Sequence, residues 1–114
     1  MGRKQMNLLQ GTLDVLVLKA LAETSRHGYG VAEWIRATTD GTLEIEDGAL
    51  YTSLHRMHNR GWIEASWGVS ENNRRAKYYQ LTTAGNQQLE HEVSYWRNYA
   101  AAVFKVLEPT KPEG

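Results

Sequence analysis

The strongest constraint on the fold of this chain is an apolar stripe along its C-terminal third. Six apolar residues recur there at alternating spacings of four and three: Leu89, Val93, Trp96, Ala100, Val103 and Leu107. This is the heptad-like pattern of a helix that packs along another helix, and it is about 27 Å long at 1.5 Å per residue. A second stripe beside it consists of Tyr95, Tyr99, Ala102 and Val106. The residues before this helix are too few to cover both stripes, so the pattern predicts a second copy of the chain as partner.

Length and composition place the chain among small globular proteins. It has 114 residues, of which 41% are hydrophobic and 23% are charged, which suits one domain with a core. Asp14 and Lys19 interrupt the most apolar run, residues 13–21, so we expect no membrane helix, and the N-terminus lacks the pattern of a secretory signal. The absence of cysteine excludes disulfides and thiol nucleophiles. We therefore expect a cytoplasmic protein.

Helical spacing of apolar residues predicts four helices. The first three are expected at residues 9–22, 29–38 and 46–60. The last begins near Thr82, a residue typical of helix N-caps, and continues to about residue 106. Four helices with little room for strands indicate a mostly α fold.

A single β-hairpin is expected between the third and the last helix. Ile63, Ala65 and Trp67 alternate along one strand, and Tyr79 and Leu81 alternate along another. Residues 68–74 between them are rich in turn-forming residues. The sequence therefore predicts a mostly α fold with a small β-hairpin.

The third predicted helix has one apolar and one polar side. Leu50, Leu54 and Met57 share the apolar side, and the other side is short and rich in hydrogen-bonding groups. A helix of this kind fits the major groove of DNA. The candidate contacts are Tyr51, Thr52, Ser53 and Arg56. Two alternatives remain open: Tyr51 packs its ring and exposes only its hydroxyl, and Arg56 contacts a phosphate rather than a guanine.

Basic residues gather in two places although the net charge is zero. The hairpin loop and its second strand contain one group, which is a candidate phosphate-binding site: Asn73, Arg74, Arg75 and Lys77. Arg3 and Lys4 form a second group that suits a DNA-contacting arm. The alternatives are solvated hairpin charges for the first group and a frayed terminus for the second.

No catalytic or metal-binding constellation is expected. His55 and His58 have a spacing compatible with metal ligation, but no carboxylate or third histidine completes a site. The nucleophile and acid-base pairs of an enzyme are also missing from the sequence. We therefore predict a protein that is not an enzyme and has no cofactor.

Three helices, a hairpin and a long last helix match the winged helix-turn-helix plan. The sequence also resembles the PadR family of bacterial transcriptional regulators. The matching stretches, spread over residues 9–85, are LQGTLD (9–14), HGYG (27–30), GALY (48–51), LHRM (54–57), RGWIE (60–64) and RRAKYYQLT (74–82). Thr52, where relatives often have proline, and Met57-His58, where a Leu-Glu pair is common, depart from the family and bear on base preference.

The resemblance implies a winged helix-turn-helix DNA-binding domain at residues 1–82, a dimerisation helix at 83–108 and a flexible tail at 109–114. It also implies a homodimeric repressor that binds a near-palindromic operator on double-stranded DNA. The first and last helices would form the dimer interface. The interface residues are expected to be Leu13, Leu16, Leu89, Val93, Ala100 and Leu107.

Some relatives bind planar drugs at the dimer interface, which implies a possible site for a small planar aromatic effector. Its candidate residues are Val15, Trp96, Tyr99 and Val103. Packing of Trp96 against its symmetry mate is the alternative. A second function class is a winged-helix module that binds another protein instead of an operator.

Overall fold

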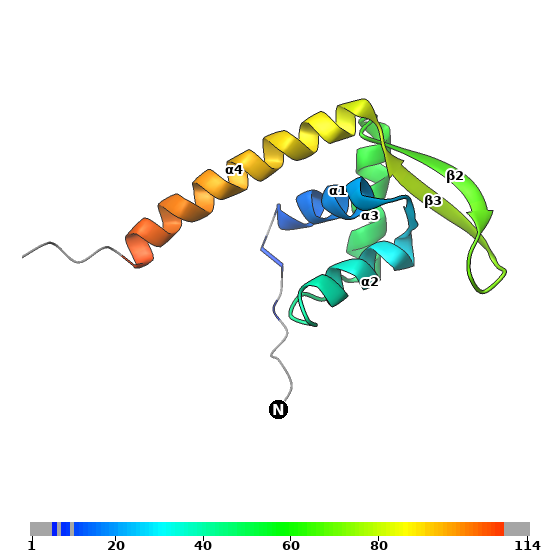
Figure 1. The fold of residues 1–114 in the computed structure, drawn as a ribbon, viewed down its shortest axis with the longest axis horizontal. Helices are drawn as coiled ribbons and strands as arrows, with labels where there is room; N and C mark the ends of the chain where they lie inside the picture. The colour runs from blue at the N-terminus through cyan, green and yellow to red at the C-terminus, as the bar shows by residue number, and fades with distance from the viewer. Residues whose placement is uncertain (1–5, 7, 10, 109–114) are drawn as a thin grey trace, which may run out of the picture.

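The computed structural model of this chain describes residues 6, 8–9 and 11–108. Its elements follow the expected order of three helices, a hairpin and a long helix (Figure 1). They are α1 (Thr12–Glu23), β1 (Arg26–His27), α2 (Gly28–Thr38), α3 (Asp47–Asn59), β2 (Ile63–Val69), β3 (Arg75–Leu81) and α4 (Thr83–Leu107). This order confirms the mostly α winged helix-turn-helix fold.

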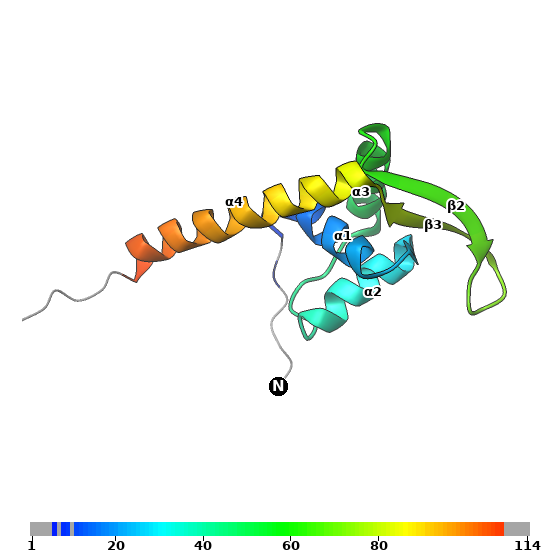
Figure 2. The ribbon, with the colours of Figure 1, turned by 45° about the horizontal axis from the view of Figure 1, so that its top comes forward.

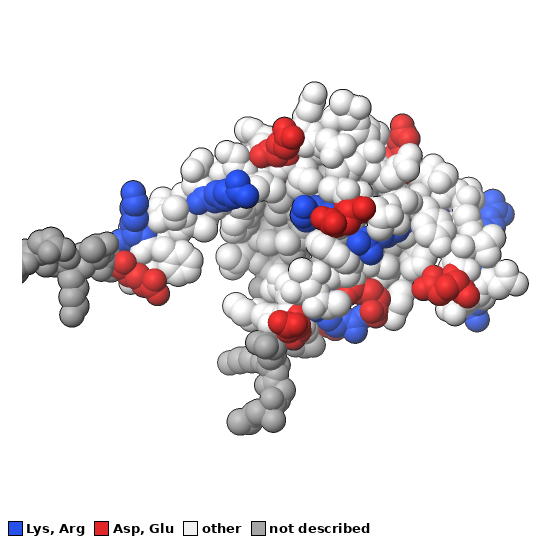
Figure 3. All heavy atoms as spheres, in the orientation of Figure 1, with Lys and Arg blue, Asp and Glu red and all other residues white. Residues whose placement is uncertain are grey.

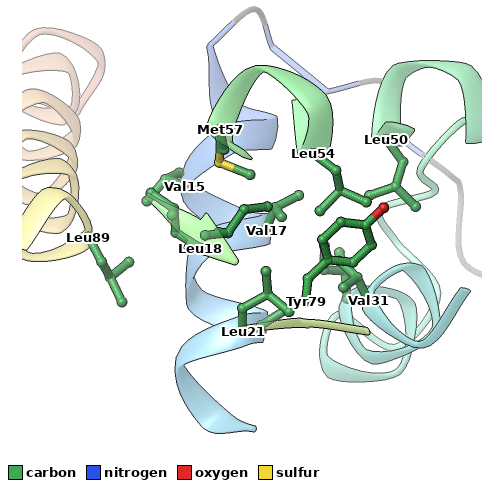
Figure 4. Close-up of a cluster of buried hydrophobic side chains, with 13 residues drawn as sticks. Val15, Val17, Leu18, Leu21, Val31, Leu50, Leu54, Met57, Tyr79 and Leu89 are labelled. Atoms are coloured by element: carbon green, nitrogen blue, oxygen red, sulfur yellow. The ribbon is translucent and has the colours of Figure 1, made fainter. Parts of the chain in front are cut away.

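The hydrophobic core lies where α1, α2, α3 and the base of the hairpin meet (Figure 4). Val17 and Leu18 of α1 are completely buried at its centre, as are Val31 of α2 and Leu50 of α3. The other buried apolar residues are Val15, Ala20, Leu21, Ile35, Leu54, Met57, Ile63, Tyr79 and Leu89. The predicted apolar side of α3 is thus confirmed.

The hairpin pairs β2 with β3 in antiparallel register, from Ile63 opposite Leu81 to Val69 opposite Arg75. A third strand was not predicted: β1 pairs with the other edge of β3, giving the order β1-β3-β2. With only two residues, β1 is too short to show alternating hydrophobicity.

Local signals in the sequence explain where the helices begin. The side chain of Thr82 accepts a hydrogen bond from the amide of Gly85 at 3.0 Å, which confirms Thr82 as the N-cap of α4. His27 caps α2 in the same manner, because its Nδ1 accepts from the amide of Gly30 at 3.0 Å. The expected start of the first helix at residue 9 is wrong, since Gly11 adopts a left-handed conformation (φ 86°) and α1 begins at Thr12.

The long helix α4 leaves the rest of the domain partway along its length. In both ribbon views, its first half lies over α1 and its second half extends away from the other elements (Figures 1 and 2). Leu89 is buried, whereas Val93 and Trp96 are half-buried against the core. Leu107 near the far end is 65% exposed.

Two of the residues expected at the dimer interface belong instead to the core of this chain. Leu89 was predicted as an interface residue and Val15 as part of an effector site, but each is only 8% exposed. The apolar stripe of α4 therefore serves two roles along its length: its start packs on α1, and its far part is open to solvent. The prediction was wrong for these two residues because periodicity cannot show where a helix leaves its own domain.

Candidate nucleic-acid interface

The exposed side of α3 carries polar side chains. Tyr51, Thr52, His55 and Asn59 are exposed on this side, and the Nδ2 of Asn59 lies 3.3 Å from the Nε2 of His55. The exposed positions recur at spacings of three and four residues, so they form one strip along the helix. This strip, Thr52, His55 and Asn59 with Tyr51 at its margin, is called the polar strip below.

Ser53 is not part of the polar strip, so its prediction as a DNA contact is wrong. Its side chain is 1% exposed, and its Oγ donates a hydrogen bond to Oδ1 of Asp14 at 2.6 Å. Because Ser53 follows Leu50 by three residues, it lies on the buried side of α3, where its hydroxyl needs a partner. Asp14 supplies that partner from α1.

Arg56 lies at the margin of the polar strip that faces α1. Its Nη2 donates to the same Oδ1 of Asp14 at 2.5 Å, and its side chain keeps 41% exposure. The structure therefore shows Arg56 in an ion pair rather than as a free cation. In the sequence Asp14 stood out only as an interruption of an apolar run, because the contact joins residues 42 positions apart.

Tyr51 lies at the opposite margin of the strip, against the start of α2. A Cβ at Gly28 would lie 2.5 Å from the Tyr51 hydroxyl oxygen, so the end of this ring lies directly against the backbone of Gly28. Tyr51 is nevertheless 50% exposed. The hydroxyl end of the ring thus lies against Gly28, which contradicts the alternative in which only the hydroxyl is exposed. Contact of Tyr51 with DNA stays a prediction.

A groove of about 390 Å³ lies between the hairpin and the start of α2, with Tyr51 of α3 at its border. Tyr51 and Gly28 line one side, and Arg75, Lys77 and Tyr79 line the other. Burial raises the pKa of the Tyr79 phenol, and the nearby Tyr51 raises it further. The hairpin, called the wing below (residues 63–81), therefore lies beside α3 as the winged helix-turn-helix plan requires.

One face of the wing combines cations with an aromatic ring. Lys77 is opposite Trp67 and Arg75 is opposite Val69, so these four side chains share a face. The guanidinium of Arg75 lies over the Trp67 ring at 4.4 Å from its centroid, a cation–π contact that orients it. Trp67 is 60% exposed and was not predicted as a site residue. Trp67 could be recognised as a site residue only from its pairing with Lys77, and this pairing is known only once the register of the hairpin is known.

The other predicted basic residues have different outcomes. Asn73 and Arg74 are exposed at the tip of the wing, where Asn73 has a left-handed backbone (φ 58°). Arg3 and Lys4 lie outside the described residues. Figure 3 shows cations toward the outer end of the wing with acidic atoms nearby, on a face of mixed charge. The basic character is therefore local, as the zero net charge indicates.

His27 connects the wing to α2. Its Nδ1 caps α2, its Nε2 lies 3.7 Å from Oε1 of Glu71 in the wing, and its ring centroid is 5.3 Å from that of Tyr78. His27 was not predicted as a site residue, because its position depends on β1. These contacts place the His27 side chain between α2 and the wing, the two elements on either side of the groove.

On the outer surface of α2, Glu33 accepts hydrogen bonds from Tyr29 at 2.8 Å and from Arg36 at 2.6 Å. The hydrogen bond to Glu33 raises the pKa of the Tyr29 phenol, and the charges of Glu33 and then Glu44 raise the pKa of Arg36. These pairs are exposed and contribute little to stability.

Two other classes of site bear on function, the metal centre and the membrane span. The part of the chain that the structure describes contains no group of three histidine, aspartate or glutamate side chains arranged to hold a metal ion. Within residues 6, 8–9 and 11–108, no helix has the length and apolar character needed to cross a membrane.

The sequence matches a family of known regulators. Residues 17–91, more than half of the chain, match the family described as the transcriptional regulator PadR-like family. A protein of Lysinibacillus sphaericus named Uncharacterized protein X is 29% identical over 90 residues, which cover 79% of this chain and 83% of that protein. The family match extends from α1 into α4, so it includes the polar strip and the wing.

Solved structures of regulators share the fold. A transcriptional regulator from Clostridium thermocellum has a TM-score of 0.77 and 27% identity, and the match covers 84% of this chain and 90% of that one. A PadR family transcription regulator from Clostridium difficile has a TM-score of 0.74 and 27% identity, with 85% and 99% coverage. The chain therefore belongs to the PadR-like family of transcriptional regulators.

Proposed function

We propose that this PadR-like regulator is a repressor that binds a near-palindromic operator as a homodimer. The observation that supports the proposal most directly is that Tyr51, at the margin of the polar strip, and the wing cations Arg75 and Lys77 line one groove. A polar helix fits the major groove, and Arg75 and Lys77 suit the flanking phosphates. The strip would then select the sequence, and the wing would supply affinity for any duplex.

We propose that a second copy of the chain packs against the exposed part of α4, residues 95–107. Tyr95, Tyr99, Phe104, Val106 and Leu107 are each at least 50% exposed on this one helix. Of these, Tyr95, Tyr99 and Val106 are spaced by four and seven residues and so share one side of the helix. An exposed apolar stripe of this kind is characteristic of a protein interface. Pairing of two α4 helices would present two copies of α3 to one duplex, with their centres about 34 Å apart for successive major grooves.

Mobility shift with salt titration tests operator binding. The duplexes are fragments from the upstream region of the gene that encodes this chain and random duplexes of equal length. We expect tighter binding to one upstream fragment and a linear fall of log K with log salt concentration. Equal binding to all fragments, or none at low salt, would contradict the proposal. A stable dimer that ignores DNA would instead favour the protein-binding module.

Repression has a separate test. Transcription from the promoter on the bound fragment is measured in vitro with and without the protein. We expect the transcript to decrease as the fragment becomes occupied. An increase would show that the protein is an activator.

We also propose a planar aromatic effector for the aromatic cluster of α4. The rings of Trp96 and Tyr99 meet edge to face with centroids 6.0 Å apart, and those of Tyr95 and Tyr99 stack at 5.9 Å. These rings, together with Val103, offer flat apolar surfaces at the proposed dimer interface. Tyr95 adds to the residues that the sequence suggested.

Fluorescence tests this site. A planar aromatic anion such as 1-pyrenesulfonate, which duplex DNA repels, is expected to quench tryptophan emission and to release the operator fragment. Trp96→Ala should remove most of the quenching, whereas Trp67→Phe in the wing should keep it. Quenching that persists in Trp96→Ala would place the anion elsewhere.

A further inference from the structure

One carboxylate joins the first helix to the polar strip. Oδ1 of Asp14 in α1 accepts from Ser53 at 2.6 Å and from Arg56 at 2.5 Å, both in α3. Ser53 is buried, and the carboxylate itself is only 21% exposed. The cluster Asp14–Ser53–Arg56 is thus an ionic contact at the edge of the core, with one side open to solvent.

Arg56 is placed where it can reach a duplex bound by α3. It follows Thr52 by four residues and precedes Asn59 by three, so it neighbours both on the surface of the helix. A guanidinium has five N–H donors in a fixed fork, and the bond to Asp14 uses one of its two terminal NH₂ groups. The remaining donors and the 41% exposed side chain are available to a phosphate or a base edge.

Asp14 itself is unsuited to contact DNA. Its negative charge repels phosphates, and the oxygen that faces α3 already accepts two hydrogen bonds. Its effect on DNA must therefore pass through Arg56. Without the carboxylate, Arg56 would be a flexible cation able to follow any phosphate, whereas the ion pair limits it to one orientation.

We propose that Asp14 is a positioning residue that sets DNA discrimination by restraining Arg56. The inference rests on the proposed operator binding. On a random duplex, α3 has no fixed register, so no phosphate lies at a constant position where the restrained Arg56 could bind it. The restraint leaves Arg56 aligned for the operator, on which α3 is seated in one register. Asp14 thereby lowers non-specific affinity more than operator affinity.

The main test compares Asp14→Asn with Glu23→Gln. Asparagine keeps an acceptor for Ser53 but lacks the charge that holds Arg56. Glu23 lies on the same helix in an exposed pair with Lys19, so Glu23→Gln makes the same charge change away from α3. Dissociation constants are measured for the operator fragment selected above and for a random duplex, over a salt series.

The expected result is specific to Asp14. Asp14→Asn should bind the random duplex more tightly, with a salt slope steeper by about 0.9. Its preference for the operator should fall by about fivefold or more. Glu23→Gln should keep the wild-type preference. Equal preference in the two variants would overturn the inference.

Two further variants separate positioning from folding. Ser53→Ala should lower the melting temperature but keep the operator preference, because Arg56 retains its partner. A loss of preference in Ser53→Ala equal to that in Asp14→Asn would assign the effect to helix placement and overturn the inference. If Asp14→Asn does not fold, Arg56→Gln is used, and it should lower both the preference and the salt slope. No change in either would overturn the inference.

The same measurements distinguish this inference from the proposed function. If the wild-type protein binds operator and random duplexes equally, operator recognition itself is wrong. If the wild type discriminates and Asp14→Asn matches Glu23→Gln, only the role of Asp14 is wrong.

Discussion

At Gly85 the backbone of α4 passes so close to the start of the wing that no side chain fits. A Cβ at this position would overlap the carbonyl oxygen of Trp62. The same carbonyl accepts a hydrogen bond from the amide of Thr82 at 3.0 Å, so it has little freedom to move away. Gly85 therefore fixes where α4 crosses the base of the wing.

Matched glycine substitutions test this close approach. Gly85→Ala should lower the free energy of unfolding by about 2 kcal/mol or more, despite the higher helix propensity of alanine. Gly48→Ala, in the first turn of α3, meets no atom within 4 Å and should raise it by about 0.5 kcal/mol. Urea denaturation of both variants provides the measurement. A stabilised Gly85→Ala would show that the two segments do not meet in this way.

Because of the raised pKa of Tyr79, we expect the free energy of unfolding to fall at alkaline pH. The pKa of Tyr79 in the folded chain lies above its ordinary value of about 10, because burial and then Tyr51 disfavour the phenolate. The folded state thus holds its proton more tightly than the unfolded state. The contribution of Tyr79 is complete below about pH 10 and is lost as the pH rises through the folded pKa.

Denaturation midpoints at pH 8 and at about pH 10.5 test this dependence. Tyr79→Phe should lose less stability over this interval than the wild type. Tyr95→Phe, which changes a 60% exposed ring, serves as the control. An equal loss in Tyr79→Phe and the wild type would contradict the assignment.

At the scale of elements, the wing is expected to contact DNA independently of sequence. Changing Arg74 and Arg75 together to alanine should weaken binding to operator and random duplexes alike. The salt slope should flatten by about 0.9 for each phosphate that the wing no longer neutralises. The control changes Lys19 and Lys105 to alanine, which removes the same charge from α1 and α4. A selective weakening on the operator alone would instead assign base reading to the wing.

Most of the helices and strands were predictable, because each long element has a characteristic spacing of apolar residues and capping or turn-forming residues at its ends. Helical spacing identified α2, α3 and α4, and Thr82 marked the start of α4. The strand β1 was not predictable, since its two residues make sense only against β3. Within the candidate site, the buried position of Ser53 is predictable from the helical period, because Ser53 follows the apolar Leu50 by three residues. The role of Asp14 is not predictable, because its partners are distant in sequence.

At the scale of the whole molecule, a single charged substitution in the exposed part of α4 tests the proposed dimer. Val103→Glu would place like charges at the proposed interface and should raise the dimer dissociation constant about thirtyfold or more. Operator affinity should fall with it. The fold of the monomer should persist, since Val103 lies outside the core cluster. Analytical ultracentrifugation and circular dichroism provide the two readouts.

Asn98→Glu is the matched control, because Asn98 is exposed on the polar side of the same helix. It should keep the mass of the wild type. If Val103→Glu has the same mass as Asn98→Glu and the wild type, the copies meet by another surface.

The division of α4 at Trp96 has an evolutionary consequence. Among the described residues, none of α4 beyond Trp96 packs against the core, so substitutions there leave the stability of the DNA-binding domain largely unaffected. Selection can thus change the sequence of this segment while the winged helix is inherited nearly unchanged. If this segment forms the proposed dimer interface, paralogues that share the winged helix would avoid mixed assembly through a few substitutions at the end of a single helix.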